Sequence, residues 1–198
     1  MKFTKYTAFI FICIFAVLFI IIHFLRTDLI FLKYPLSRYT IGEYGKLLSV
    51  GFVCFGLSEI LLGFLIYRYI GKLNLVSILV IVAGLGVFLA TFFSLDIQHK
   101  PTLGGNLHFL GALIQFVLFP FFCLHSFKYV FKDRLKKWAL VIAVTTFFFC
   151  LLLTLAICLK NDILFAVAEK TDIVVFTVWL MSVELWMICN STCSSDSF

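Results

Sequence analysis

The residues of this sequence whose side chains could take part in chemistry are few. The stretch "HFLRTDLIFLKYPLSRYTIGEYG", which lies between two long apolar runs, carries Arg26, Asp28, Ser37 and Tyr39. A guanidinium group recognises phosphate, and hydroxyl groups donate and accept hydrogen bonds. These four residues are therefore candidates for binding the polar end of an amphiphile.

A histidine and an aspartate flank the next polar connection of this kind. Asp96 ends the third apolar run in "FFSLDIQHKPT", and His108 begins the fourth in "GGNLHFLGALIQ". A paired histidine and aspartate can serve as a general base and its orienting group, so both are candidate catalytic residues. We expect them to meet Arg26 and Asp28 at one depth and to form a polar cup there.

The fourth apolar run also predicts an inward face. At spacing i, i+3, i+4 and i+7 it carries His108, Gly111, Ala112 and Gln115, which places them on one side of a helix. Small residues allow a neighbouring helix to approach, and polar ones look for partners there. Gln115 is either a ligand-binding group or a helix-to-helix hydrogen bond, and the spacing leaves both interpretations open.

Two carboxyl residues lie inside apolar runs. Glu59 in "GLSEILLGF" shares its helix face with two glycines, so it should point into the bundle. Glu184 in "MSVELWM" lies near two tryptophans and could reach toward headgroups or take part in proton transfer. If the two approach one another, they would form a pair that shares a proton.

Cofactor, metal and hydrolase interpretations are weaker. His23 and His108 match in depth as haem ligands would, but no second pair does. Asp28, Asp96 and the two histidines lie on separate segments, without the compact spacing of a metal site. Ser37 in "PLSRY" lacks the glycine-flanked elbow of a serine nucleophile. We therefore expect neither a metal nor a cofactor.

The elements that must position these residues are transmembrane helices. The chain of 198 residues is 63% hydrophobic and only 13% charged, which is too little polar surface for a soluble protein. Six apolar runs are each long enough to cross a bilayer, at about 6–25, 47–67, 73–93, 106–127, 138–159 and 172–190. We predict an all-α polytopic bundle of six transmembrane helices, forming a single domain over residues 1–198.

The distribution of lysine and arginine predicts the orientation. With a cytoplasmic N-terminus, nine basic residues lie inside and seven outside, and five of the nine fall in "KYVFKDRLKK". Six spans would return the C-terminus to the cytoplasm. The net charge of +6 fits this signal and attraction to anionic headgroups, and no basic stripe indicates nucleic-acid binding. We expect a multi-pass inner-membrane protein whose partners are membrane lipids.

A family resemblance rests on the same residues. The segments "HFLRTDLIFLKYPLSRYTIGEYGKLLSVGF", "FSLD" and "LHFLGALI" resemble the bacterial membrane-protein family called domain of unknown function 998, from about His23 to Glu184. The resemblance points to Arg26, Asp28, Pro35, Ser37, Tyr39, Gly42, Gly45, Asp96 and His108. The chain departs from the family pattern at Thr27 and Ser94, where proline is usual, and at Arg38, where a carboxylate is common. The chain is more distantly similar to DRAM-like membrane proteins.

The resemblance implies a fold and a set of positions, but no reaction. Our leading hypothesis is a membrane protein whose extracytoplasmic cup binds or processes a lipid headgroup or similar amphiphile, with Arg26 on phosphate and Asp96 and His108 on a hydroxyl or proton. The alternatives are a small proton-coupled transporter or permease, using Glu59 or Glu184, and a non-catalytic scaffold. Whether the chain is an enzyme stays open, and the sequence indicates no protein partner.

Overall fold

A computed structural model describes residues 2–93, 95, 102–129 and 134–192 of the chain. These residues form six α-helices and one short 3-10 helix, in the order α1 (Lys2–Leu25), η1 (Leu36–Thr40), α2 (Gly45–Ile70), α3 (Leu75–Phe92), α4 (Leu103–Tyr129), α5 (Arg134–Leu159) and α6 (Asp162–Thr192). Each of the six α-helices is long and apolar enough to cross a membrane. The predicted all-helical membrane bundle is confirmed.

Local signals in the sequence explain where several helices begin and end. The Asn74 side chain caps α3 by accepting a hydrogen bond from the Ser77 N–H, and Asn161 caps α6 by accepting one from the Leu164 N–H, both at 3.0 Å. Gly71 ends α2 in the left-handed conformation, with φ of 77°. Polar caps at these sites satisfy amides that the first helical turn leaves free.

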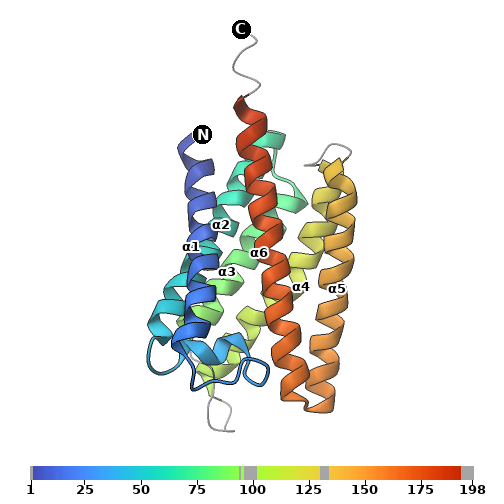
Figure 1. The fold of residues 1–198 in the computed structure, drawn as a ribbon. Helices are drawn as coiled ribbons and strands as arrows, with labels where there is room; N and C mark the ends of the chain where they lie inside the picture. Colours follow the sequence, from blue (N-terminus) through green and yellow to red (C-terminus); the bar gives the residue numbers. More distant parts are fainter. Residues whose placement is uncertain (1, 94, 96–101, 130–133, 193–198) are drawn as a thin grey trace.

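The helices form a closed ring. Each α-helix packs against the next one in the chain, and α6 returns to pack against α1 (Figure 1). Helix α2 also contacts α6 across the ring. Both termini lie at one end of the bundle, and the segment with η1 lies at the other (Figure 1), which we call the loop end.

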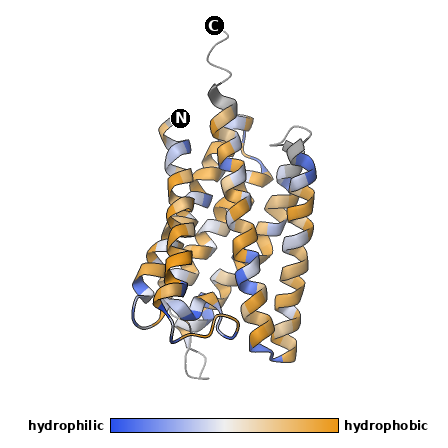
Figure 2. Ribbon diagram, in the orientation of Figure 1, coloured by the Kyte–Doolittle hydropathy of each residue, from blue (hydrophilic) through white to orange (hydrophobic). Residues whose placement is uncertain are grey.

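Apolar residues predominate along the helices, as the hydropathy colours of Figure 2 show, and many of their large side chains are exposed. Helices α2 and α6 are the most enclosed, with 56% and 50% of their spans buried, whereas α1 and α5 are buried over only 22%. Large aromatic side chains such as Phe15, Phe119, Phe176 and Trp179 fill the interior. Helices α2 and α6 are therefore the inner helices, and they are the ones that carry buried carboxyl groups.

Glycines set the close approach of α2, α3 and α4. A Cβ atom placed on Gly84 of α3 would meet the backbone carbonyl of Gly56 in α2, and one placed on Gly86 would meet the carbonyl of Gly111 in α4. Such contacts between small residues are typical of helix pairs in membranes. They draw α4 inward, so that its polar face reaches the interior of the ring.

The structure corrects the predicted start of the sixth span. Helix α6 begins at Asp162, ten residues before the predicted start at Asp172. The turn from α5 contains only Lys160, which has a left-handed φ of 52°, and the cap Asn161. Glu169 and Lys170 therefore belong to a helix and not to a connecting loop.

Candidate functional site

The stretch "KYPLSRYTIGEYG" folds over the loop end of the bundle and is held there by α6. The Glu169 carboxylate accepts a hydrogen bond of 2.5 Å from the Leu36 N–H, and Ser37 adds hydrogen bonds from its N–H and its hydroxyl. Lys170 donates to the backbone carbonyls of Phe31 and Tyr34, the latter at 2.7 Å. These contacts seat η1 against the inner helix.

Arg26 holds the same loop from within. Its Nε and Nη2 atoms donate to the two carboxylate oxygens of Asp28 at 2.8 and 2.9 Å. Its Nη1 donates to the carbonyls of Ile41 and Glu43 at 2.6 and 3.3 Å, as well as to that of Tyr39. The hydrogen bond from Arg26 lowers the pKa of the Asp28 carboxyl and raises the pKa of the guanidinium. Arg26 is therefore a clamp within the loop.

Tyr39 anchors the loop in the bundle. Its side chain is buried, its ring packs on that of His23 at 4.8 Å between centroids, and the Lys170 ammonium lies 5.0 Å from its ring centre. Its hydroxyl donates to the carbonyl of Leu29 at 3.4 Å, and burial raises the pKa of the phenol. The predicted ligand-binding residue Tyr39 is thus part of η1, and its buried side chain lines neither cavity.

His108, near the start of α4, has one ring nitrogen fixed by the end of α3. Its Nδ1 lies 2.6 Å from the carbonyl oxygen of Ala90 and 3.0 Å from that of Phe93. Both neighbours are acceptors, so Nδ1 carries the proton and donates it. In the neutral ring Nε2 is then an acceptor, which leaves a basic lone pair for a ligand.

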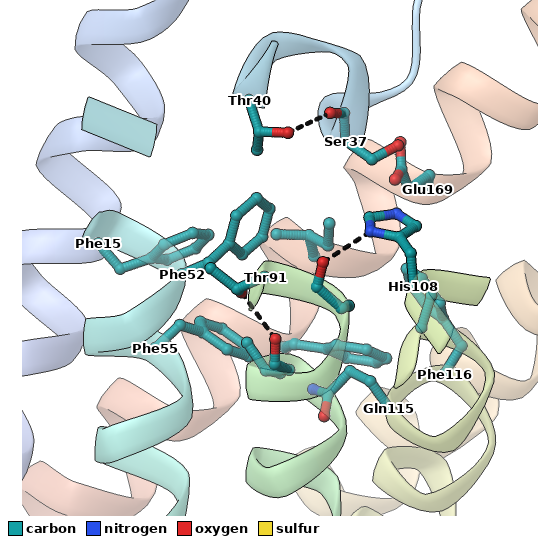
Figure 3. A pocket seen from close by; sticks show the side chains of 15 residues that line it. Phe15, Ser37, Thr40, Phe52, Phe55, Thr91, His108, Gln115, Phe116 and Glu169 are labelled. Carbon is teal, nitrogen blue, oxygen red and sulfur yellow. Dashed lines mark hydrogen bonds between the residues drawn. The ribbon is translucent and has the colours of Figure 1, made fainter. Parts of the chain in front are cut away.

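An inner pocket of about 60 Å³ lies among η1 and helices α1, α2, α3, α4 and α6. Five phenylalanines form much of its wall: Phe15, Phe52, Phe55, Phe116 and Phe176. Its polar lining residues are Ser37, Thr40, Thr91, His108, Gln115 and Glu169. Figure 3 shows Ser37, Glu169 and His108 close together on one side, with Phe15, Phe52 and Phe55 across from them.

An outer groove of about 200 Å³ adjoins the inner pocket and runs between α4, α5, α6 and the loop before η1. The two cavities share Ser37, His108, Ala112, Phe116 and Glu169. Four other residues of the groove have large exposed apolar side chains, namely Phe109, Leu113, Val117 and Ile157. The groove therefore opens to the lipid-facing side of the bundle, and its polar groups lie where it meets the inner pocket.

Few charged side chains line the two cavities. Among the described residues that line them, Glu169 alone has a formally charged side chain, and it already accepts hydrogen bonds from η1. The nearby cations Arg26 and Lys170 bind loop carbonyls. A ligand here meets hydroxyl, imidazole and amide groups, and no described lysine or arginine.

Deeper in the bundle, Gln115 connects the inner pocket to buried carboxyl groups. Its Nε2 donates to Glu59 Oε1 at 2.8 Å, and the Ser58 hydroxyl donates to Glu184 Oε1 at 2.6 Å. Glu59 and Glu184 are 0% and 1% exposed. The prediction that Glu59 points into the bundle agrees with this burial, and Glu184 also lies inside.

The predicted site residues thus divide into separate groups. His108, Ser37 and Gln115 line the inner pocket, whereas Arg26 and Asp28 pair with one another in the loop. Asp96 lies outside the described residues, so its meeting with His108 stays a prediction. No group of three or more histidine, cysteine, aspartate or glutamate residues in the described part of the chain is arranged to hold a metal ion.

Sequence reasoning missed Glu169, Lys170 and the buried Asp172 of α6. Their run "EKTD" has the composition of a solvated connection. The sequence feature that indicates the earlier helix start is Asn161, a favoured helix cap. It is followed by a segment with no glycine or proline until the predicted span. Extending the helix back to this cap would have placed Glu169 and Lys170 in α6 and moved Asp172 from its first residue to its interior.

Comparison with known proteins agrees with the resemblance seen in the sequence. The family model described as "Protein of unknown function (DUF998)" matches residues 9–185. Comparison with curated proteins and with solved structures gave no match. Because the family match covers most of the chain and all six helices, this multi-pass membrane protein belongs to the DUF998 family.

Proposed function

We propose that this protein takes an amphiphile from the bilayer through the outer groove and holds its polar end at the inner pocket. One observation carries the proposal: the lipid-facing groove and the inner pocket share Ser37, His108 and Glu169. An acyl chain would lie along the exposed apolar wall, and its polar end would reach the hydrogen-bonding groups. Burial of apolar ligand surface supplies the affinity, and the few polar groups fix the orientation.

The polar end that fits is uncharged and carries hydroxyl groups. His108 Nε2 offers an acceptor, while the hydroxyls of Ser37, Thr40 and Thr91 can accept hydrogen bonds. A phosphate would have no described lysine or arginine to pair with in either cavity, and charged groups are costly to bury without a partner. The small inner pocket suits a glycerol or alcohol end better than a large headgroup. This proposal assigns Arg26 to the loop and not to the ligand.

The test compares two probes with the same acyl chain. The purified protein is titrated with 1-monooleoylglycerol and with monooleoyl phosphatidic acid, and bound lipid is counted by native mass spectrometry. We expect monooleoylglycerol to bind at least tenfold more tightly, a difference of about 1.4 kcal/mol. Equal or tighter binding of the phosphate-bearing probe would overturn the assignment of a neutral ligand.

Two tryptophan variants test whether the lipid binds at the cavities. Ala112 lines both cavities, so Ala112→Trp should fill their junction and lower the affinity for monooleoylglycerol at least tenfold. The matched control is Leu110→Trp, on the same helix but outside both cavities, where the side chain is exposed. Circular dichroism and thermal unfolding confirm that both variants fold. Unchanged binding in folded Ala112→Trp, or no binding to the unsubstituted protein, would favour a scaffold.

A further inference from the structure

Two buried carboxyl groups in the middle of the bundle are incompletely paired. Glu59 receives one hydrogen bond from Gln115, and Glu184 receives one from Ser58. Within the described residues, the Oε2 atom of each carboxyl group has no hydrogen-bond partner. The side chains are fully or almost fully enclosed, so water does not freely supply the missing hydrogen bonds.

The two carboxyl groups lie close enough to influence each other. Glu184 interacts electrostatically with Glu59, and the Ser58 that binds Glu184 is the chain neighbour of Glu59. Among the other titratable groups, Cys13 of α1 interacts with Glu184 and Cys123 of α4 interacts with Glu59, while Asp172 of α6 interacts with Cys123. No lysine, arginine or histidine is among the described groups that interact with either carboxyl.

Two negative charges in this setting would be costly. The effective penalty for burying an ion is several kcal/mol, and a like charge nearby adds to it. A bound proton removes one charge and turns one acceptor oxygen into a donor for a neighbouring acceptor. Strongly interacting carboxyl groups of this kind take up protons as a unit.

We propose that Glu59 and Glu184 form a proton-binding site inside the membrane, and that Gln115 links its occupancy to the inner pocket. The proton site stands independently of the proposed function, and only the link to the pocket rests on it. In the structure, Glu59 accepts a hydrogen bond from the Gln115 amide nitrogen, as an ionised carboxylate would. A protonated Glu59 can instead donate to the amide oxygen, which has no partner among the described residues.

A proton on Glu59 changes which end of the Gln115 amide group is turned away from Glu59. When the carbonyl oxygen turns toward Glu59, the amide nitrogen turns toward its other neighbours. Gln115 lines the inner pocket, so a proton on Glu59 changes an acceptor beside the pocket into a donor. By thermodynamic linkage, a ligand that prefers one form must take up or release protons when it binds.

The first experiment tests the proton site without a ligand. The protein in lipid nanodiscs is titrated with acid while infrared absorption follows the carbonyl stretch of protonated carboxyl groups. We expect two separated steps for the pair. Glu59→Gln should leave one step for Glu184, displaced by about one pH unit or more. The control Asp162→Asn, at an exposed position, should keep both steps of the pair.

Each other outcome counts against the proton site. If Glu59→Gln removes one titration step and leaves the other at the same pH, the two carboxyl groups titrate independently. If no protonated carboxyl is lost in Glu59→Gln or Glu184→Gln, the site does not bind a proton. Should Glu59→Gln fail to fold, Ser58→Ala keeps both carboxyl groups and removes the donor to Glu184. It should displace both steps of the pair, whereas displacement of one step alone would show that the groups are independent.

The second experiment tests the link with 1-monooleoylglycerol as the probe. Binding in weak buffer with a pH-indicator dye should release or take up protons, and Gln115→Met should abolish this exchange while the two titration steps persist. Lipid binding without proton exchange in the unsubstituted protein would overturn the link. Two titration steps with no lipid binding would contradict the proposed function and the link, but uphold the proton site.

Discussion

At the scale of the residue, one ring nitrogen of His108 has a structural role, and we propose that the other contacts the ligand. Its Nδ1 donates to carbonyls at the end of α3, where the last helical turn leaves acceptors unpaired. Its Nε2 is the acceptor that the neutral ring leaves for the cavities. The two roles can be separated because different side chains imitate the two nitrogens.

Asparagine at position 108 places an amide nitrogen near the position of Nδ1, so it can keep the bonds to Ala90 and Phe93. We expect His108→Asn to fold with nearly unchanged thermal stability but to bind monooleoylglycerol at least fivefold more weakly, about 1 kcal/mol. His108→Leu loses both functions and should also lower the free energy of unfolding by about 1–3 kcal/mol.

Binding isotherms and thermal unfolding in the same detergent measure these two effects. The unsubstituted protein and Leu110→Ala, a variant at an exposed position outside both cavities, set the range expected from purification alone. If His108→Asn bound the probe normally, Nε2 would have no role in the ligand site.

At the scale of the element, the loop from residue 26 to residue 44 behaves as a lid held by two clamps. Arg26 binds three carbonyls of the loop and Asp28, while Glu169 and Lys170 fasten it to α6. Gly42 has a φ of 85° and lies against the Arg26 guanidinium, and this backbone conformation suits glycine. Of the two clamps, the Arg26–Asp28 pair is the one outside the membrane-spanning helices.

The Arg26–Asp28 clamp should weaken in acid. The folded loop lowers the pKa of Asp28 below its ordinary value of 3.8, so the pair stabilises the loop above that value. The contribution is lost as the pH falls through the lower pKa of the folded state. We expect amide hydrogen exchange in the loop, corrected for intrinsic rates, to speed up in this acid range.

Asp28→Asn removes the titrating group and serves as the control. Its loop should exchange faster than the unsubstituted loop at neutral pH and should lack the acid-dependent increase. A parallel acid response in both proteins would show that another group governs the lid. Because the Asp28 side chain is 61% exposed, solvent screens the pair and the effect should stay confined to the loop.

At the scale of the whole molecule, both termini lie at one end of the bundle and the lid at the other. The lysine and arginine distribution predicts that the terminal end faces the cytoplasm. In a background in which Cys158, Cys189 and Cys193 are replaced by serine, Lys46→Cys near the lid should react with a membrane-impermeant maleimide in intact cells. Lys72→Cys, in the α2–α3 turn, should react only after lysis, and the reverse pattern would invert the topology.

Much of this architecture could be predicted because each span is a local property of the sequence. Twenty consecutive apolar residues determine a helix whatever the rest of the chain does. The inward face of α4 was predictable in the same way, since the spacing from His108 to Gln115 repeats with the helical turn. Both side chains are at least nine-tenths buried.

The candidate site was less predictable because its partners are distant along the chain. Arg26 was expected to face a ligand, yet its donors bind Asp28 and loop carbonyls, and backbone acceptors cannot be recognised from residue types. Glu169 and Lys170 were read as part of a connection because charged residues rarely enter a span. Their burial is tolerated since the loop supplies backbone partners 133 and 139 residues away.

That separation has a consequence for biosynthesis. The lid is made early, but α6, the helix that fastens it, is made after the other five helices. At a translation rate of roughly 5–20 residues per second, Glu169 and Lys170 are synthesised on the order of ten seconds after the loop. Until then its amides at residues 36 and 37 have no carboxylate to bind, and the ring from α1 to α6 stays open. The inner pocket is therefore completed only once α6 has joined the other helices in the membrane.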